Sequence, residues 1–460
     1  MQMIRQMQKI SETYDSAQQD TLANNQSPLK RNQQPKRNQQ PKETSNQKKP
    51  VTVAKNSQDD LTQENTEMNS ATANQDEVKP PAANVRPQAD CHSEGATCSA
   101  NVNINVNASQ SLDSTSADQL KQAIQDCLQA DLEQVNQAIK NQLRSRNPLV
   151  AEMVDHVSCY QGKQLRPILL LLIHRMTVAA KPNQPQTLDG QANSAVSKDA
   201  QQAAYLLAAS VEMIHLATLV HDDVIDEAET RRHVATVHRR WNTESSVLLG
   251  DYLFSRAFHL SAMAGDATAC ALIGKATDRT CEGEFNQMAA RSSQSKSELD
   301  YFRIIRGKTG QLFGLSSCLG ARSAGGSESQ QAAAARFGIR LGLAFQIADD
   351  ILDLTQTSQS TGKDAANDVQ NGRRTLPILR ALRFASEDEA STLNDLLDHS
   401  SADSFHQLKQ LPCVAKGIES ATQTAQNLID RASQDLSNFS DCVERQLLAS
   451  IVQFAIRRNG

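Results

Sequence analysis

Two aspartate clusters of the same form decide the fold: Asp-Asp-Val-Ile-Asp at 222–226 and Asp-Asp-Ile-Leu-Asp at 349–353, each inside an apolar run. On a helix, the first and last aspartates of each cluster stand one turn apart on one face. Ionised carboxylates among aliphatic neighbours are costly unless they are paired or bound to metal. Oxygen-only clusters suit a hard cation such as Mg²⁺, which prefers carboxylates together with substrate phosphates.

The chain around these clusters has a helical pattern from about Ser116 to Gly460. Apolar residues recur there at three- and four-residue spacing, and alternating strand patterns are absent. The pattern predicts a loop over 181–198 and an all-α domain over 116–460, with ten or more helices around a central apolar cavity. Beyond a first helix behind the candidate caps Ser114, Thr115 and Ser116, helices are expected over 148–160, 166–180, 200–226, 244–264, 266–290, 298–320, 330–355, 373–386, 389–398, 415–438 and 441–457.

The first 115 residues have a different composition from the rest of the 460-residue chain, whose net charge is −5. They are rich in Gln, Asn, Ser and Lys, and the basic element at 30–35 is repeated at 36–41. Such a segment cannot bury enough apolar surface to fold, so residues 1–115 are predicted to be a disordered, low-complexity polar tail. A tether for an anionic partner is the alternative interpretation. Nothing in the sequence points to nucleic acid as a partner.

Cysteine usage and hydropathy predict a cytoplasmic protein. The nine cysteines are scattered and form no Cys-x-x-Cys pair, so neither a disulfide framework nor a zinc site is expected. The first ten residues are too polar for a signal peptide, and no apolar run is long enough to cross a bilayer. A reduced compartment and no transmembrane segment are therefore expected.

Basic residues lie close in sequence to the aspartate clusters. Lys163 and Arg166 precede a predicted helix, where backbone amides and side-chain charge together favour an anion. Arg231 and Arg232 follow the first cluster, and arginine is suited to forked contacts with phosphate oxygens. Lys308 and Lys363 add further cations. An acidic chain that places cations beside its aspartates predicts a site for a metal-bridged polyphosphate.

Taken in order, these elements resemble the trans-type polyprenyl diphosphate synthases. The resemblance covers about 145–385 strongly and the remaining helices weakly. It implies an isoprenoid-synthase-type helical bundle and a Mg²⁺-dependent, chain-elongating prenyltransferase. It is carried by Gly162 to Pro167, Ile214-His215, His221 to Asp226, Thr230 to Arg232, Gly250 to Leu253, Cys281 to Glu284, Lys308 to Gly310, Phe345 to Asp353, Gly362-Lys363 and Thr375 to Pro377.

The resemblance also implies a role for each matching residue. Mg²⁺ would be bound by Asp222, Asp226 and Asp349, with support from Asp223, Asp350 and Asp353. An allylic diphosphate would meet Arg231, Lys308 and Lys363, and isopentenyl diphosphate would meet Lys163, Arg166, His215 and Arg232. Thr309 and Gln346 would face the developing cation. A homodimer is expected, and the product would be released at a membrane surface.

Small residues before the first cluster bear on product length. Ala217 and Thr218 lie about one turn before Asp222 and Ile214 about two turns before it, so the cavity floor is open at that level and the product is predicted to hold about seven or eight isoprene units. A product of this length would serve as a quinone side chain. Three alternatives stay open: a geranylgeranyl or farnesyl diphosphate synthase, a metal-dependent phosphohydrolase that uses His215 and His221, and a catalytically silent partner subunit.

Some positions depart from the family's usual pattern. His233 and Ala235 stand where Gly and Pro commonly follow the arginine doublet, which puts the shape of that turn in question. Glu282 and Glu284 are open to two interpretations, a solvated face or support for the aspartate cluster.

Overall fold

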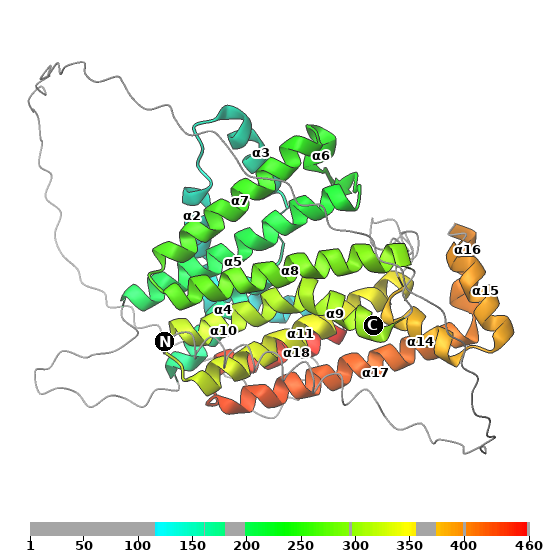
Figure 1. Ribbon diagram of the computed structural model, residues 1–460. Helices are drawn as coiled ribbons and strands as arrows, with labels where there is room; N and C mark the ends of the chain where they lie inside the picture. Colours follow the sequence, from blue (N-terminus) through cyan, green and yellow to red (C-terminus); the bar gives the residue numbers. More distant parts are fainter. Residues whose placement is uncertain are drawn as a thin grey trace, which may run out of the picture. The chain divides into compact units, whose positions relative to one another are not determined.

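A computed structural model describes residues 116–160, 162–179, 198–293, 297–355, 374–398 and 402–457. These residues are almost wholly helical (Figure 1), which confirms the predicted all-α class. The first helices are α2 (Ala117–Gln142), α3 (Pro148–Ser158), α4 (Leu165–Ala179) and α5 (Lys198–Ile225). They are followed by α6 (Val237–Arg240), α7 (Thr243–Met263), α8 (Ala267–Ser293), α9 (Glu298–Ile305), α10 (Gln311–Ser323), α11 (Glu328–Thr355), α14 (Leu376–Phe384), α15 (Glu387–Asp398), α16 (Ala402–Gln410), α17 (Pro412–Asp435) and α18 (Val443–Arg457).

Helix α2 begins at the predicted cap. The Ser116 hydroxyl accepts a hydrogen bond from the Gln119 amide, and the Gln119 side chain accepts one from the Ser116 amide at 2.8 Å. This reciprocal arrangement satisfies two backbone donors that a helix start would otherwise leave unpaired. Asn147 and Asn242 cap α3 and α7 in the same general way, so polar residues set several helix starts.

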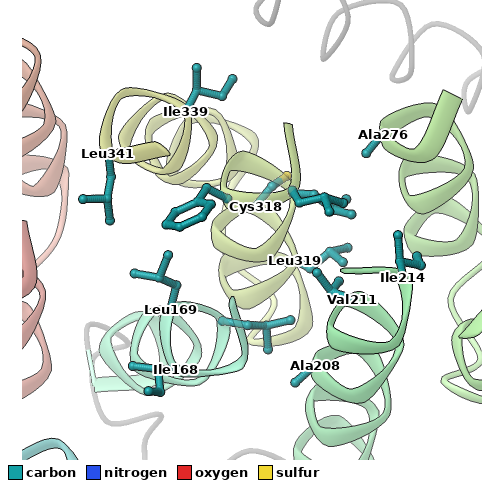
Figure 2. Packing of buried hydrophobic residues seen from close by; sticks show 14 of the residues in the cluster. Ile168, Leu169, Ala208, Val211, Ile214, Ala276, Cys318, Leu319, Ile339 and Leu341 are labelled. Carbon is teal, nitrogen blue, oxygen red and sulfur yellow. The ribbon is translucent and has the colours of Figure 1, made fainter. Parts of the chain in front are cut away.

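Helix α10 lies at the centre of the bundle. It packs against α4, α5, α8 and α11, and every residue from 311 to 321 is buried. Figure 2 shows Cys318 and Leu319 of α10 among Leu169 of α4, Val211 of α5 and Ala276 of α8. Burial of so many aliphatic side chains, each contributing about 1.5–3 kcal/mol, outweighs the helix propensity of any one segment.

Glycines allow α10 and α11 to pack closely, as expected for Gly338 and Gly342. A Cβ atom at Gly338 would lie 2.3 Å from the Phe313 carbonyl oxygen, and one at Gly342 would lie 3.0 Å from the Gly310 Cα. The backbones of the two helices therefore approach where a larger residue would push them apart. This contact fixes α11, and with it the second aspartate cluster, against the start of α10.

Several features differ from the sequence expectation. The predicted helix over 298–320 is interrupted by a π-helical turn, η2 (Arg306–Gly310), and a short 3-10 turn, η3 (Leu436–Asn438), follows α17. Two short strands, β1 (Thr230–Arg231) and β2 (Val234–Ala235), pair antiparallel although no strand was predicted. Helix α16 was not predicted either. The predicted tail, the predicted loop over 181–198 and Lys363 lie outside the described residues.

Helix α5 carries the first aspartate cluster at its C-terminal end. It is the one described helix long and apolar enough to cross a membrane, yet 61% of its most apolar window is buried inside the bundle. Within the described part of the chain it is therefore a core helix. Its apolar length reflects burial on several sides, against α2, α4, α7 and α10.

Candidate active site

The first aspartate cluster faces the π-helical turn η2. The ammonium group of Lys308 lies 3.3 Å from an Asp222 carboxylate oxygen and 2.7 Å from a carboxylate oxygen of Glu284 on α8. Burial alone would lower the pKa of Lys308, but Asp222, Glu284 and Asp226 together raise it. Burial and the neighbouring Asp222 raise the pKa of Glu284. Lys308 is therefore a half-buried cation that pairs with two carboxylates, and Asp226 contributes a further favourable charge.

Two glycines position Glu284 beside Lys308. Their backbones touch: a Cβ atom at Gly283 would lie 2.7 Å from the backbone nitrogen of Lys308, and one at Gly307 would lie 2.8 Å from the Gly283 Cα. Helix α8 can therefore lie directly on η2, and the residue after Gly283 reaches the Lys308 ammonium. Glu282, the other acid considered, is exposed.

We expect Gly283→Ala to disturb this arrangement. The added methyl group would lie against backbone atoms of Gly307 and Lys308, so η2 must shift. This shift should cost about 1–3 kcal/mol of unfolding free energy. Catalytic activity should fall about tenfold as Lys308 moves, measured as kcat with saturating substrates. Gly274→Ala on the same helix is the matched control, because its Cβ would meet nothing within 4 Å. Equal behaviour of the two variants would contradict the positioning role.

The second aspartate of the first cluster points away from Lys308. Asp223 is 1% exposed and accepts hydrogen bonds on one oxygen from Nε and Nη2 of Arg231, each at 2.8 Å. Its other carboxylate oxygen is buried without a hydrogen-bond partner. Burial raises the pKa of Asp223, and the bonds from Arg231 oppose that shift. Asp223 thus holds the Arg231 side chain in place.

The second aspartate cluster is linked to the same turn. The Thr309 hydroxyl donates to the Gln346 carbonyl oxygen at 3.0 Å, and the Gln346 amide nitrogen donates to Asp350 at 2.9 Å. Asp350 is 3% exposed, whereas Asp349 and Asp353 on the other side of α11 are half-buried. Adjacent residues of η2 are therefore linked to both clusters, Lys308 directly to the first and Thr309 through Gln346 to the second. π-Helical turns are frequent at functional sites because they re-aim side chains in this way.

A group of basic residues surrounds His215, which lies on α5 about two turns before Asp222. Arg166 comes from α4, and Arg231 and Arg232 come from the β1–β2 hairpin. Burial and then the charges of Arg166, Arg231 and Arg232 hold the pKa of His215 well below its ordinary value, so the imidazole is neutral at pH 7. Burial lowers the pKa of Arg166 to about 10, opposed by Glu212. Neither Arg166 Nε nor one Glu212 oxygen has a hydrogen-bond partner, although both atoms are buried. These unpaired atoms fit a site that is completed by a polar ligand.

The turn after the first cluster is well defined despite its unusual sequence. Arg232 and His233 link β1 to β2 with φ values of 51° and 67°, the left-handed conformation that a two-residue hairpin turn requires. Arg232 donates to the Tyr160 carbonyl oxygen at 2.5 Å, and its guanidinium occupies the space that a side chain at Gly162 would need. The turn thus brings Arg232 to the loop that bears Lys163.

An apolar pocket opens beside this basic group. It lies between α4, α10, α11 and α18, and Lys163 is one of the residues that line it. The guanidinium of Arg166 lies 5.0 Å from the centre of the Phe313 ring, which also lines the pocket. The other lining residues are Leu165, Leu169, Leu341, Phe345, Ile451, Phe454 and Ala455.

The structure brings most of the predicted site residues together in two groups. Asp222, Asp226, Lys308, Thr309 and Gln346 lie around η2, and Arg166, His215, Arg231 and Arg232 form the basic group. Ala217 and Ile214 are fully buried, and the Thr218 hydroxyl donates to the His215 carbonyl oxygen. His221 stands apart from both groups, with its ring 3.1 Å from the Val247 carbonyl oxygen.

The fold and these groups define an all-α enzyme built to bind two anionic substrates beside a deep apolar core. A family model described as polyprenyl synthetase matches residues 147–412, which is more than half of the chain. The chain belongs to the polyprenyl synthetase family. It is therefore an enzyme that transfers prenyl groups.

Several named proteins are similar to this chain. It is 29% identical to octaprenyl diphosphate synthase of Haemophilus influenzae, over 73% of this chain and 96% of the relative. It is 31% identical to a nonaprenyl diphosphate synthase of Rhodobacter capsulatus, over 71% of this chain and 95% of the relative. Among solved structures, a polyprenyl synthase from Caulobacter crescentus complexed with calcium and isoprenyl diphosphate has a TM-score of 0.65 at 29% identity, covering 74% of this chain and 98% of that one.

Proposed function

We propose that this enzyme condenses isopentenyl diphosphate with an allylic diphosphate to make a medium-to-long all-trans polyprenyl diphosphate for quinone side chains. The observation that carries the proposal is the turn η2, whose Lys308 pairs with the first aspartate cluster and whose Thr309 is linked to the second through Gln346. Relatives named octaprenyl diphosphate synthase, nonaprenyl diphosphate synthase and heptaprenyl diphosphate synthase component 2 support the product class.

The donor set fits Mg²⁺. Asp222 and Asp226 stand beside Lys308, they offer only carboxylate oxygens, and Asp349 would complete the set. Within the described ranges, no three acidic, histidine or cysteine side chains close around a single point, and Lys308 pairs with Asp222 at 3.3 Å. When bound, Mg²⁺ neutralises charge on the leaving diphosphate.

Each residue group has a separate task in the reaction. Lys163, Arg166, Arg232 and neutral His215 bind isopentenyl diphosphate, while Arg231, Lys308 and Lys363 bind the allylic diphosphate. Lys308 stabilises the charge that gathers on the diphosphate as its bond to the allylic carbon breaks. The oxygens of Thr309 and Gln346 face the resulting cation. The double bond of isopentenyl diphosphate then attacks, and the proton lost afterwards passes to the departed diphosphate.

Product length is set by small residues on α5. Figure 2 shows Val211 and Ile214 on the side of α5 that lies toward α8 and α10. Asp223, near the C-terminal end of this helix, accepts a hydrogen bond from Arg231. We propose that Ala217, Thr218 and Ile214 set how far the growing chain can extend.

We expect Ala217→Phe to shorten the product by several isoprene units. Ala217 is 0% exposed, so an aromatic ring there must occupy space within the bundle. Chromatography of the dephosphorylated products measures the shift. Ala415→Phe, at an exposed position of α17, is the matched control and should leave the product spectrum unchanged. An unchanged spectrum from Ala217→Phe would contradict this assignment.

The overall proposal is tested by incubating the enzyme with isopentenyl diphosphate, farnesyl diphosphate and Mg²⁺. Longer prenols after dephosphorylation support it, and products of about four units would indicate a geranylgeranyl diphosphate synthase. Release of inorganic phosphate without chain growth would indicate a phosphohydrolase. Against that outcome, His215 lies among arginines and His221 lies against a backbone carbonyl oxygen. Inactivity without a second protein would indicate a partner subunit.

We infer further that the enzyme works as a homodimer in the cytoplasm and releases its product at a membrane surface. The absence of a disulfide pattern in the sequence and the core position of α5 support the cytoplasmic location. Sedimentation of the purified enzyme with and without lipid vesicles tests the homodimer and the contact with a membrane. A monomer that ignores vesicles would overturn them.

A further inference from the structure

A buried tyrosine extends the chain of hydrogen bonds behind the second aspartate cluster. Tyr301 on α9 is 7% exposed, and its hydroxyl donates to Asp350 Oδ2 at 2.6 Å. The other Asp350 oxygen, Oδ1, accepts from the Gln346 amide nitrogen at 2.9 Å. The two carboxylate oxygens thus have different donors from different elements, α9 and α11.

The direction of these bonds determines how the Gln346 amide is oriented. A carboxylate only accepts hydrogen bonds, so Asp350 must receive the NH₂ end of Gln346. The carbonyl end of Gln346 therefore turns toward η2, where it accepts the Thr309 hydroxyl hydrogen at 3.0 Å. Because each donor in the series is polarised by the charged Asp350, the exposed lone pairs of Gln346 and Thr309 gain negative character.

We propose that Tyr301 is a positioning residue for prenyl transfer, acting through Asp350 to hold the Gln346 carbonyl and the Thr309 hydroxyl toward the allylic cation. The inference rests on the proposed function. Asp350 does two things in this arrangement: it fixes an amide that faces the cation, and it stays turned away from the face of α11 that carries Asp349. Loss of the Tyr301 hydroxyl removes the 2.6 Å hydrogen bond to Asp350 Oδ2, so the carboxylate and the Gln346 amide that it orients are held less firmly.

The chain contains a matched control for this tyrosine. Tyr205 on α5 also donates its hydroxyl to a carboxylate oxygen at 2.6 Å, that of Asp131 on α2. Asp131 also pairs with Arg175 at 2.5 Å, in a contact among α2, α4 and α5 that includes none of the residues around η2. Tyr205→Phe therefore removes the same kind of bond without touching the residues around η2.

The test compares Tyr301→Phe, Tyr205→Phe and their parent in steady-state elongation and thermal unfolding. We expect Tyr301→Phe to lower kcat about tenfold with the KM for isopentenyl diphosphate unchanged, while Tyr205→Phe keeps the parental kcat. A kcat of Tyr301→Phe within twofold of the parent overturns the proposal. So does a loss explained by unfolding at the assay temperature, which the two melting curves reveal.

A double-mutant cycle tests whether Tyr301 acts through Gln346. In a Gln346→Ala background, Tyr301→Phe should cause no further loss of kcat, because the group that it orients is already gone. Equal fold losses in both backgrounds would overturn the proposal. Failure of the parent to elongate at all would instead refute the proposed function, so the two failures are distinguishable.

Discussion

Asp222→Asn should lower the kcat of chain elongation by about a thousandfold, since Lewis-acid stabilisation of a leaving group is worth several kcal/mol. Asp222 is 9% exposed and lies 3.3 Å from Lys308, and in the proposed mechanism it would hold the metal beside the lysine that meets the same diphosphate. The amide keeps the shape but loses the charge. Single-turnover elongation at a series of Mg²⁺ concentrations measures the effect, and higher Mg²⁺ should recover part of it.

Two variants show whether this loss is specific. Asp278→Asn removes a negative charge from an exposed position on α8 and should leave elongation unchanged. Asp223→Asn should act differently from Asp222→Asn, because Asp223 orients Arg231 and does not face Lys308. We expect it to raise the KM for the allylic substrate more than it lowers kcat. An Asp222→Asn enzyme with more than a tenth of the parental kcat would refute the metal-binding role.

The helices and the two aspartate clusters could be predicted because they depend on local sequence. Apolar spacing of three and four residues reports which side of a helix is buried, and the clusters interrupt that pattern with charge. The same periodicity also separates neighbouring aspartates. Adjacent aspartates on a helix are about 100° apart, so Asp223 and Asp350 face away from their neighbours and orient Arg231 and Gln346 instead.

Contacts between distant segments could not be predicted. Whether Glu284 lies in a solvated face or in the site depends on the backbone contact between Gly283 and Gly307, which local patterns do not report. Tyr301 gave no signal either, because an aromatic residue at helical spacing fits an ordinary core position. The π-helical turn is also invisible in sequence, since one extra residue in a turn depends on packing against α8 and α11.

The turn at Arg232 and His233 shows the limit of rules about residue preference. Their positive φ values normally favour glycine or asparagine, and the sequence offers neither. The surrounding contacts hold the turn instead: Arg232 bonds to the Tyr160 carbonyl oxygen, and the Thr236 hydroxyl donates to the Ala228 carbonyl oxygen at 2.7 Å. Strained residues that persist in this way commonly occur at ligand sites.

Lys308→Met should lower kcat/KM for the allylic substrate by about a thousandfold, comparable to the loss of other preorganised charge stabilisers in enzymes. It should also cost about 1–3 kcal/mol of unfolding free energy, because the substitution leaves Asp222 and Glu284 half-buried without their shared cation. The pKa of Glu284, already raised, would rise further. Its folded pKa then lies above its unfolded value, so unfolding free energy should increase as the pH falls toward 5.

The double variant Lys308→Met/Glu284→Gln separates catalysis from stability. Removing the Glu284 charge relieves its repulsion with Asp222. The unfolding free energy, measured with denaturant, should therefore recover most of the loss caused by Lys308→Met, and its pH dependence should weaken. Elongation should stay as low as in Lys308→Met, because the cation that stabilises the leaving diphosphate is still missing. If activity recovered together with stability, Lys308 would be a structural neutraliser of Asp222 and Glu284, and the leaving-group role would pass to the arginines.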